Sequence, residues 1–201
     1  MSTRRAAVSV SEMTVHLQRC AADVIEIGAY RGRGPDIARI VGEHGWPLPH
    51  FGRAANGRAA SVDDGYVLSV RPDRWLMLSD SADPGVHAAA WQRACAGSGI
   101  AIDQSSGLSC LHFSGLQTRE VLARSCRLDL DPDVFAPGSA AATIMVQVPV
   151  IIAALPSGLL LLPPSSTARH FHEWLASAAR PFGLSVKSDT TLSAVLRSEF
   201  P

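Results

Sequence analysis

The sequence predicts an α+β protein built from two β-α-β type modules, and three observations lead to this fold class. Short β-rich runs alternate with segments of helical period along the chain. Turn residues separate neighbouring runs, as the Pro and Asp of residues 71–74 do, which is typical of antiparallel strands. The chain has 201 residues, of which 47% are hydrophobic, so it can bury a real core but is short for two large domains.

An N-terminal segment, residues 1–22, precedes the first module, which we place at residues 23–104. This module opens with a β-rich run at 23–28 and a helix that begins at Pro35, a residue favoured at the first helical position. Residues 46–64 are rich in Pro, Gly, Asn and Arg and have no period. We therefore expect a long connection there.

Two strands, a helix and a last strand complete the first module. The strands are expected at residues 66–70 and 75–79. Asp83 as N-cap and Pro84 at the first helical position begin the helix. Residues 100–103 read as the last strand. The resulting order, β-α-β-β-α-β, is the ferredoxin-like split pattern.

The second α+β module is placed at residues 105–201 and begins with a strand at 108–113. Ser114 with Gln117 three residues later has the arrangement of a capping box, which predicts a helix over 118–126. This repeats the strand-helix order of the first module.

Three apolar runs and a C-terminal helix complete the second module. The runs cover 142–148, 150–155 and 159–162, and Pro149 divides the first two. In the helix, predicted over 167–179, the apolar residues recur with helical period. We expect it to pack one face on a sheet; that face carries Phe171, Trp174 and Leu175.

One tract of 35 residues, 134–168, contains no Asp, Glu, Lys or Arg. A sheet of this composition is either covered on both faces within the chain or lies against another chain. We expect a partner surface on part of it, because obligate interfaces are apolar and depleted of charge. An outward Val150→Asp or Leu160→Asp would then block assembly and leave the fold intact. If both changes unfold the chain, the tract is core and the interface has to be sought within 31–58.

Charge and composition restrict the partners. Eighteen basic residues balance eighteen acidic ones and the isoelectric point is near 7.0, so nucleic acid is not an expected partner. No apolar stretch reaches membrane-spanning length, and the basic N-terminus is not followed by an apolar signal core. We expect a soluble, cytoplasmic protein with no membrane partner. The four cysteines match neither a zinc frame nor a disulfide scaffold, so we expect reduced thiols.

Candidate sites in the sequence are weak. The loop 31–34 places two arginines and two glycines before a helix, an anion-binding arrangement without a complete nucleotide-binding motif. His170 and His172 lie about 200° apart around a helix and cannot share a metal ion. Ser109 lacks the second glycine of a nucleophile elbow, and the acidic residues near 73 and 103–105 fit turns. We therefore expect no catalytic, cofactor-binding or metal-binding residue on this chain.

A family resemblance adds to this reading. The order and spacing of five segments resemble the gamma subunit of heterotetrameric sarcosine oxidase, best over about residues 65–183. These segments are 71–78, 103–105, 116–130, 135–139 and 172–175. That family is in turn similar to the folate-binding domain of the glycine-cleavage aminomethyltransferase, the T-protein, which agrees with the α+β class.

The resemblance implies a non-catalytic subunit that supports flavin-dependent oxidative demethylation of sarcosine or a related N-methyl amino acid. The products would be glycine, hydrogen peroxide and formaldehyde or 5,10-methylenetetrahydrofolate. The implied partners are the alpha, beta and delta subunits. They would carry NAD and tetrahydrofolate (alpha), FAD and FMN (beta) and zinc (delta), with no cofactor on this chain. The alternative is a free-standing folate-binding protein of the aminomethyltransferase type, which an isolated gene would favour.

Overall fold

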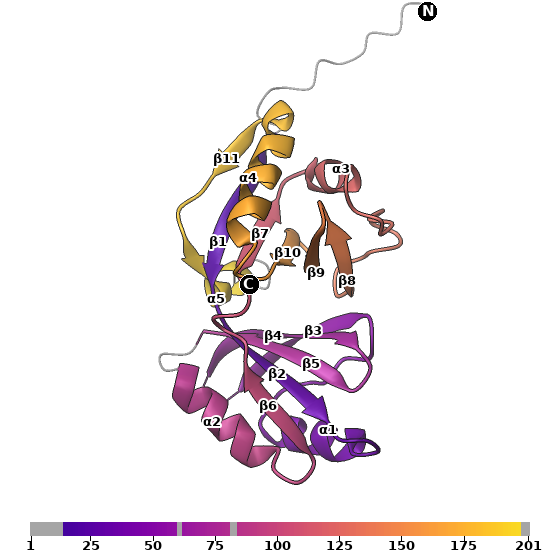
Figure 1. Ribbon diagram of the computed structural model, residues 1–201, viewed down its shortest axis with the longest axis vertical. Coiled ribbons are helices and arrows are strands. Elements are labelled where there is room, and N and C mark those ends of the chain that lie inside the picture. The colour runs from indigo at the N-terminus through magenta and orange to yellow at the C-terminus, as the bar shows by residue number, and fades with distance from the viewer. Residues whose placement is uncertain (1–13, 60–61, 81–83, 198–201) are drawn as a thin grey trace, which may run out of the picture.

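The computed structural model describes residues 14–59, 62–80 and 84–197. They form a five-stranded and a seven-stranded sheet that lie one above the other, with helices on the outer faces and the short helix α5 at the junction (Figure 1). The predicted α+β class is confirmed. We keep the chain boundaries at 22/23 and 104/105 as our proposal for the two modules, and describe the sheets separately below.

The five-stranded sheet is antiparallel throughout and has the order β3-β4-β5-β2-β6. Two helices, α1 and α2, pack on its face away from the other sheet (Figure 1). The elements are β2 (Asp23–Ala29), α1 (Gly34–Glu43), β3 (Arg53–Ala59), β4 (Val62–Arg71), β5 (Arg74–Ser79), α2 (Pro84–Ala94) and β6 (Gly99–Asp103).

Without β3, this order is the ferredoxin-like arrangement that the sequence predicts. The expected long connection at 46–64 is wrong in its second half, because β3 forms there and pairs with β4 from Arg53 to Ala59. An edge strand of small and polar residues has no apolar alternation, so only its pairing with β4 reveals it. Asp83, the expected N-cap of α2, lies outside the described residues.

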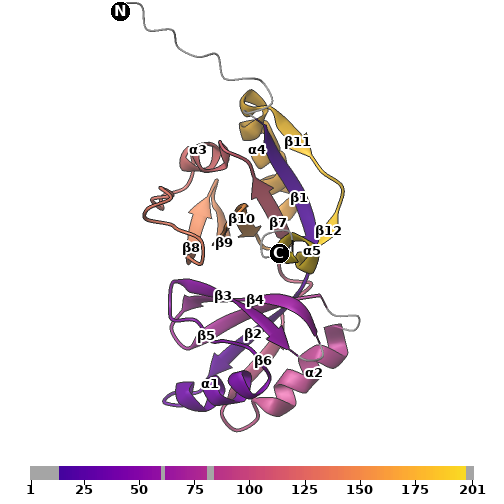
Figure 2. The same ribbon diagram turned by 180° about the vertical axis from the view of Figure 1, so that it is seen from behind.

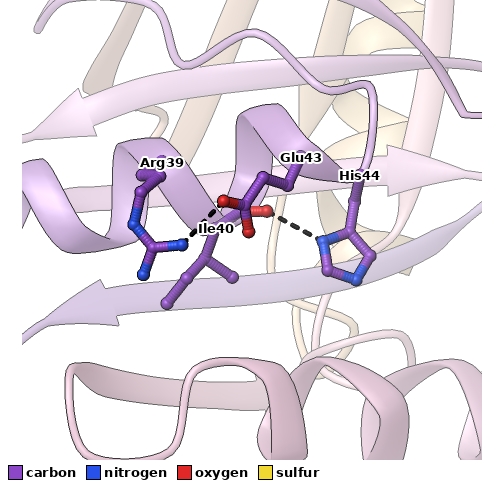
Figure 3. Close-up of polar contacts among 4 residues, drawn as sticks. All are labelled: Arg39, Ile40, Glu43 and His44. Carbon is purple, nitrogen blue, oxygen red and sulfur yellow. Dashed lines mark hydrogen bonds and ion pairs between the residues drawn. The ribbon is translucent and has the colours of Figure 1, made fainter.

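The end of α1 is held by side chains of its last turn. Arg39 forms an ion pair with Glu43 at 2.7 Å, and the His44 ring donates from Nδ1 to the carbonyl oxygen of Ile40 at 2.8 Å (Figure 3). The same imidazole lies 5.0 Å from the ring of Trp91, which is buried on α2. His44 therefore joins the two helices beneath the sheet.

The seven-stranded sheet has the order β11-β1-β7-β10-β9-β8, with β12 also paired to β1. Helices α3 and α4 pack on one face of it, and α5 lies on the side of the other sheet (Figure 2). The elements are β1 (Val15–Ala21), β7 (Cys110–Ser114), α3 (Thr118–Ala123), β8 (Ala140–Met145), β9 (Val148–Leu155), β10 (Gly158–Leu162), α4 (Ala168–Ala179), the 3-10 turn η2 (Arg180–Phe182), β11 (Leu184–Val186), β12 (Thr190–Thr191) and α5 (Leu192–Arg197).

β1 is a strand that the sequence does not signal. It lies between β7, which is antiparallel to it, and the short parallel strands β11 and β12 (Figure 2). Its partners in the register are Cys110 to Ser114 and Leu184 to Val186, far along the chain. Local periodicity carries no information about such distant pairing, and β11 and β12 are missed for the same reason; the short helix α5 is missed as well.

The three apolar runs form β8, β9 and β10, with one boundary shifted. Pro149 is the second residue of β9, and the turn falls at Val146 and Gln147, whose φ angles are 51° and 64°. β10 pairs with β9 only from Ile151 onward, so Pro149 lies where β8 is the neighbouring strand. A proline is tolerated there because no second ladder needs its missing N–H.

The expected capping box at α3 is wrong. Ser114 is the last residue of β7 and pairs with His16 and Gly158, so the sheet holds it away from the helix. The N-cap is Gln117, which makes no side-chain cap bond. The first turn is fixed instead by the Thr118 hydroxyl, which donates to the carbonyl oxygen of Gly115 at 2.7 Å.

The predicted packing of α4 is confirmed for two of its three residues. Phe171 and Leu175 are fully buried in the core beneath the helix, whereas Trp174 is half-buried at the margin of that core. The 3-10 turn and Gly183 end the helix. Trp174 lies 5.8 Å from the Phe171 ring and covers it from solvent.

Most of the charge-free tract is core within this chain, although Val134 and Ile144 are exposed. Val150 is 1% exposed and packs in the cluster beneath α3 and α4, whereas Leu160 is fully buried in the cluster between the two sheets. The expected partner surface is therefore wrong at these two positions. A sheet covered by helices on one face and by a second sheet on the other has no use for charged side chains.

Candidate functional site

A cavity lies where the chain crosses between the sheets, and it is the larger of the two described below. It has a volume of about 460 Å³, within the range of small-molecule sites. Polar and apolar groups both line it, from the β1–β2 and β6–β7 connections and from the segments beside them. The lining residues are Arg19, Cys20, Ala21, Ala22, Asp23, Asp80, Ser105, Leu108, Ser109, Cys110, Ser165 and Thr191.

The two connections are fastened to each other by Ser105. Its hydroxyl accepts a hydrogen bond from the backbone N–H of Val24 at 3.0 Å. Hydrogen bonds to the Asp103 carboxylate from the Ser105 hydroxyl and from the Ser105 N–H, the latter at 2.9 Å, hold the pKa of Asp103 below its ordinary value. The 103–105 segment is thus a turn that positions the chain, as the sequence suggests.

Asp80 fastens the third side of the cavity. Its two carboxylate oxygens accept the N–H groups of Leu192 and Ser193 at 3.1 and 3.0 Å. A carboxylate at these N–H groups caps the start of α5 and interacts favourably with the helix dipole. A residue that directly follows β5 therefore holds α5, the helix that packs between the two sheets.

Cys20 and Cys110 face each other across β1 and β7 and are both buried at the cavity wall. Contact with the Cys20 thiol, followed by burial and the nearby Asp80 charge, raises the pKa of Cys110 well above its ordinary value. Cys110 is therefore protonated at neutral pH, which makes it a poor nucleophile. The pair contributes apolar packing to the region between the sheets.

A second polar group sits further along the same strands. His112 is buried on β7 and contacts the Ser157 hydroxyl at 3.1 Å. Burial, helped by the positive charge of Lys187 and by His16, lowers the pKa of His112 to about 4. The His16 pKa is also lowered, mainly by burial. Both rings are therefore held in an environment that favours the neutral imidazole.

A smaller cavity of about 240 Å³ opens at the other side of the junction between the sheets. Glu26 on β2 is its central polar residue. It accepts hydrogen bonds from the Arg74 guanidinium at 3.0 Å and from the Gln104 amide at 3.2 Å. The other lining residues are Val70, Arg71, Trp75, Leu76, Leu108 and Ile151.

The structure does not bring the candidate site residues of the sequence together in one place. In the loop before α1, Arg33 forms an ion pair with Asp36 at 2.9 Å. Asp73 lies in the β4–β5 turn with a φ of 54°, and Ser109 donates its N–H to Pro163 just before β7. His170 is exposed on α4. Only Ser105 and Ser109 among these candidates meet at the larger cavity.

Two further findings concern the class of site. Over residues 14–59, 62–80 and 84–197, no group of three or more His, Cys, Asp or Glu side chains is placed to hold a metal ion. In the same part of the chain, no helix combines the length and the apolarity that crossing a lipid bilayer requires.

Sequence reasoning misses the residues that shape both cavities. Cys20 and Cys110 are 90 residues apart, and Asp80 is 112 residues from Leu192. No spacing motif joins such positions. The one available signal is the tight turn predicted at 71–74, which places Arg74 directly before the predicted strand; in the structure Arg74 is the first residue of β5.

The two-sheet arrangement is found in solved structures. A chain of heterotetrameric sarcosine oxidase from Corynebacterium sp. U-96, crystallised in complex with pyrrole 2-carboxylate, superposes with a TM-score of 0.71 and 25% identity, over 85% of this chain and 86% of that one. Aminomethyltransferase T of the glycine cleavage system from Bartonella henselae has a TM-score of 0.65 and 15% identity, over 90% of this chain and 48% of that one. The fold is therefore that of the aminomethyltransferase class of proteins.

The sequence relationship is more specific. The chain is 32% identical to the sarcosine oxidase subunit gamma of Corynebacterium sp. (strain P-1) over 173 residues, which is 84% of this chain and 82% of that subunit. The chain belongs to the family of sarcosine oxidase gamma subunits. No family model matches it.

Proposed function

We propose that this chain is the gamma subunit of a heterotetrameric sarcosine oxidase and acts by assembling with other subunits. The observation that carries the proposal is the 32% identity over most of both chains, together with the fold shared with a chain of the Corynebacterium sp. U-96 enzyme. The complex would oxidise sarcosine, or a related N-methyl amino acid, to glycine. Hydrogen peroxide and formaldehyde or 5,10-methylenetetrahydrofolate would be the other products.

We assign a structural role to the chain within this complex. The Cys110 thiol is protonated, and two of the carboxylates at the cavities hold the fold: Asp80 caps α5, and Glu26 binds Arg74 and Gln104. These groups support packing and not proton transfer. We assign the flavins, NAD, tetrahydrofolate and zinc to the alpha, beta and delta subunits. The proposal includes a cytoplasmic location, which suits four free cysteine thiols.

Co-expression tests the assignment. The tagged chain is produced together with the untagged other chains of its own oxidase, and the purified material is examined for subunit content and for sarcosine-dependent peroxide formation. We expect all subunits to co-purify and the complex to be active, whereas the isolated chain forms no peroxide. Turnover of sarcosine by the isolated chain, or failure of the other chains to co-purify, would contradict the proposal. Tight tetrahydrofolate binding by the isolated chain would favour the alternative, a free-standing folate-binding protein.

A further inference from the structure

β6 is an outer strand whose exposed surface is apolar. It ends the order β3-β4-β5-β2-β6, with β2 as its neighbour (Figure 1). Ile100 and Ile102 are 37% and 39% exposed on the sheet face away from α1 and α2, whereas Ala101 is buried beneath α2. Natural proteins protect such edges with charges, prolines or bulges. Gly99 to Asp103 contains one charge, at its end, and pairs with β2 without a register shift.

The opposite edge of the same sheet is protected. The pairing of β3 with β4 is interrupted by a register shift near Gly57. In addition, β3 meets the other sheet through the bridge between Arg53 and Ser139. The β3 edge of this sheet is thus protected, and the β6 edge is the one that remains free to pair with an added strand.

The backbone of β6 offers the groups that an added strand requires. In an antiparallel pair, residues alternate between those that bond to the neighbour and those that face away from it. Tyr30 donates to Ser98, and Gln104 donates to Val24, so the even-numbered residues of this strand face β2. The N–H and C=O groups of Ala101 and Asp103 consequently face outward, two residues apart, as strand addition needs.

A positive charge lies on the same surface. Gly28 separates Arg74 from Ile100 in the register, and a Cβ at Gly28 would lie 3.3 Å from Arg74 Nη1 and 3.5 Å from Ile100 Cγ1. The absence of that side chain lets the guanidinium reach across β2 to the side of Ile100. Arg74 is 45% exposed, and its bond to Glu26 leaves other N–H donors available to a carboxylate.

We propose that the β6 edge, residues 99–103, binds an extended segment of another subunit of the oxidase, which adds a strand to the five-stranded sheet. The segment carries apolar side chains beside Ile100 and Ile102 and a carboxylate opposite Arg74. This inference rests on the proposed function, since it takes its partner from the heterotetramer.

The charges on the edge favour a different chain over a second copy. If two β6 strands paired with each other, each copy would bring its own Arg74 and its isoleucines to the shared face. Asp103 pairs with Ile25, which places its side chain on the opposite face of the sheet, the face that carries the helices. The Glu26 carboxylate is already bound within its own chain. A second copy therefore supplies no carboxylate to Arg74, whereas an acidic and apolar segment of another chain does.

Two pairs of variants test the proposal in the co-expressed complex. Ile102→Asp places a charge in the apolar contact, and Ile144→Asp is its control on β8, the edge of the other sheet, where Ile144 is 60% exposed. Asp103→Pro removes an outward N–H, whereas its control, Asp103→Asn, keeps that N–H. We expect Ile102→Asp and Asp103→Pro to reduce the co-purified subunits by about tenfold or more, and the two controls to leave them unchanged.

The melting temperature of each isolated variant shows whether it folds. If either Ile102→Asp or Asp103→Pro does not fold, the other variant alone tests the proposal. Normal assembly of folded Ile102→Asp and Asp103→Pro would overturn the proposal, as would an equal loss for Ile144→Asp. The isolated wild-type chain could instead form a dimer that Ile102→Asp abolishes, while subunit assembly stays unchanged. This result would show that the β6 edge binds a second copy of the chain, and it would also overturn the proposal. A wild-type chain that binds no other subunit would refute the proposed function itself, which is a distinct result.

Arg74→Gln tests the carboxylate separately. We expect assembly to weaken and to lose part of its dependence on salt, because a partly exposed charge pair is screened by ions. The readout is the subunit yield across a salt series, with the wild-type complex in parallel. An unchanged salt dependence would show that the partner segment places no carboxylate opposite Arg74.

Discussion

The two sheets differ in how their apolar residues meet the rest of the molecule. The seven-stranded sheet contains most of a tract without charge, yet Val150 and Leu160 are buried within the chain. The five-stranded sheet has an ordinary composition, yet it exposes Ile100 and Ile102. A lack of charge therefore marks inner strands such as β9 and β10, which are covered on both faces, whereas the outer strands, β8 with its exposed Ile144 as well as β6, have to be found from the topology.

The largest expected effect separates the two sheets directly. Leu160→Asp should prevent folding or cost about 4 kcal/mol or more, because it buries a carboxylate in the apolar cluster between the sheets. Ile102→Asp, at a half-exposed edge position, should change the free energy of unfolding by about 1 kcal/mol or less. Urea denaturation of the two isolated variants makes the comparison. Similar losses in the free energy of unfolding for both variants would contradict the proposed difference between a buried position and an exposed edge position.

Acid should destabilise the seven-stranded sheet through His112. Its pKa of about 4 in the folded chain lies below the value near 6.5 in the unfolded chain, so the unfolded state binds the proton first. The contribution of the neutral ring is complete above pH 6.5 and is lost as the pH falls toward 4, by about 3 kcal/mol in total. Denaturation midpoints measured from pH 7 to pH 4 should show this loss for the wild type and a smaller one for His112→Gln. Identical pH profiles would argue against it.

The link between the sheets at Asp80 should have a moderate effect. Asp80→Ala removes the acceptor for the N–H groups of Leu192 and Ser193, and should cost about 1–2 kcal/mol. Hydrogen exchange should accelerate at the start of α5 and leave the β2–β5 ladder protected. Uniform acceleration across both sheets would show that the link holds the whole fold together.

The smallest effect is expected at the β8–β9 hairpin. Gln147 is exposed and has a φ of 64°, which a glycine adopts without strain, so Gln147→Gly should stabilise the chain by about 1 kcal/mol. Val146→Gly is a poor alternative, because Val146 packs against the core beneath α3 and α4. A lower melting temperature for Gln147→Gly would mean that the strain assumed at this turn is absent.

The elements that the sequence predicts are those with local signals. β4 and β5 flank a Pro-Asp turn, α1 has a proline in its first turn, and α4 has a helical stripe through Phe171 and Leu175. The strands it misses, such as β1 and β3, form because of a partner strand, and β1 pairs with residues near 184. The cavities are missed for the same reason, since Asp80 and Cys20 reach them only when both sheets are in place.

One residue, Ala22, separates β1 from β2, although these strands belong to different sheets. During synthesis the chain grows at about 5–20 residues per second. β2 can pair with β5 and β6 once residues up to 103 have been synthesised. β1 has to wait until β7 and then β11 follow, because Val15 pairs with Leu184. The five-stranded sheet can therefore form early during synthesis, with β1 tethered beside it and uncovered. The seconds between the two events are when a chaperone or a partner subunit has access to that strand.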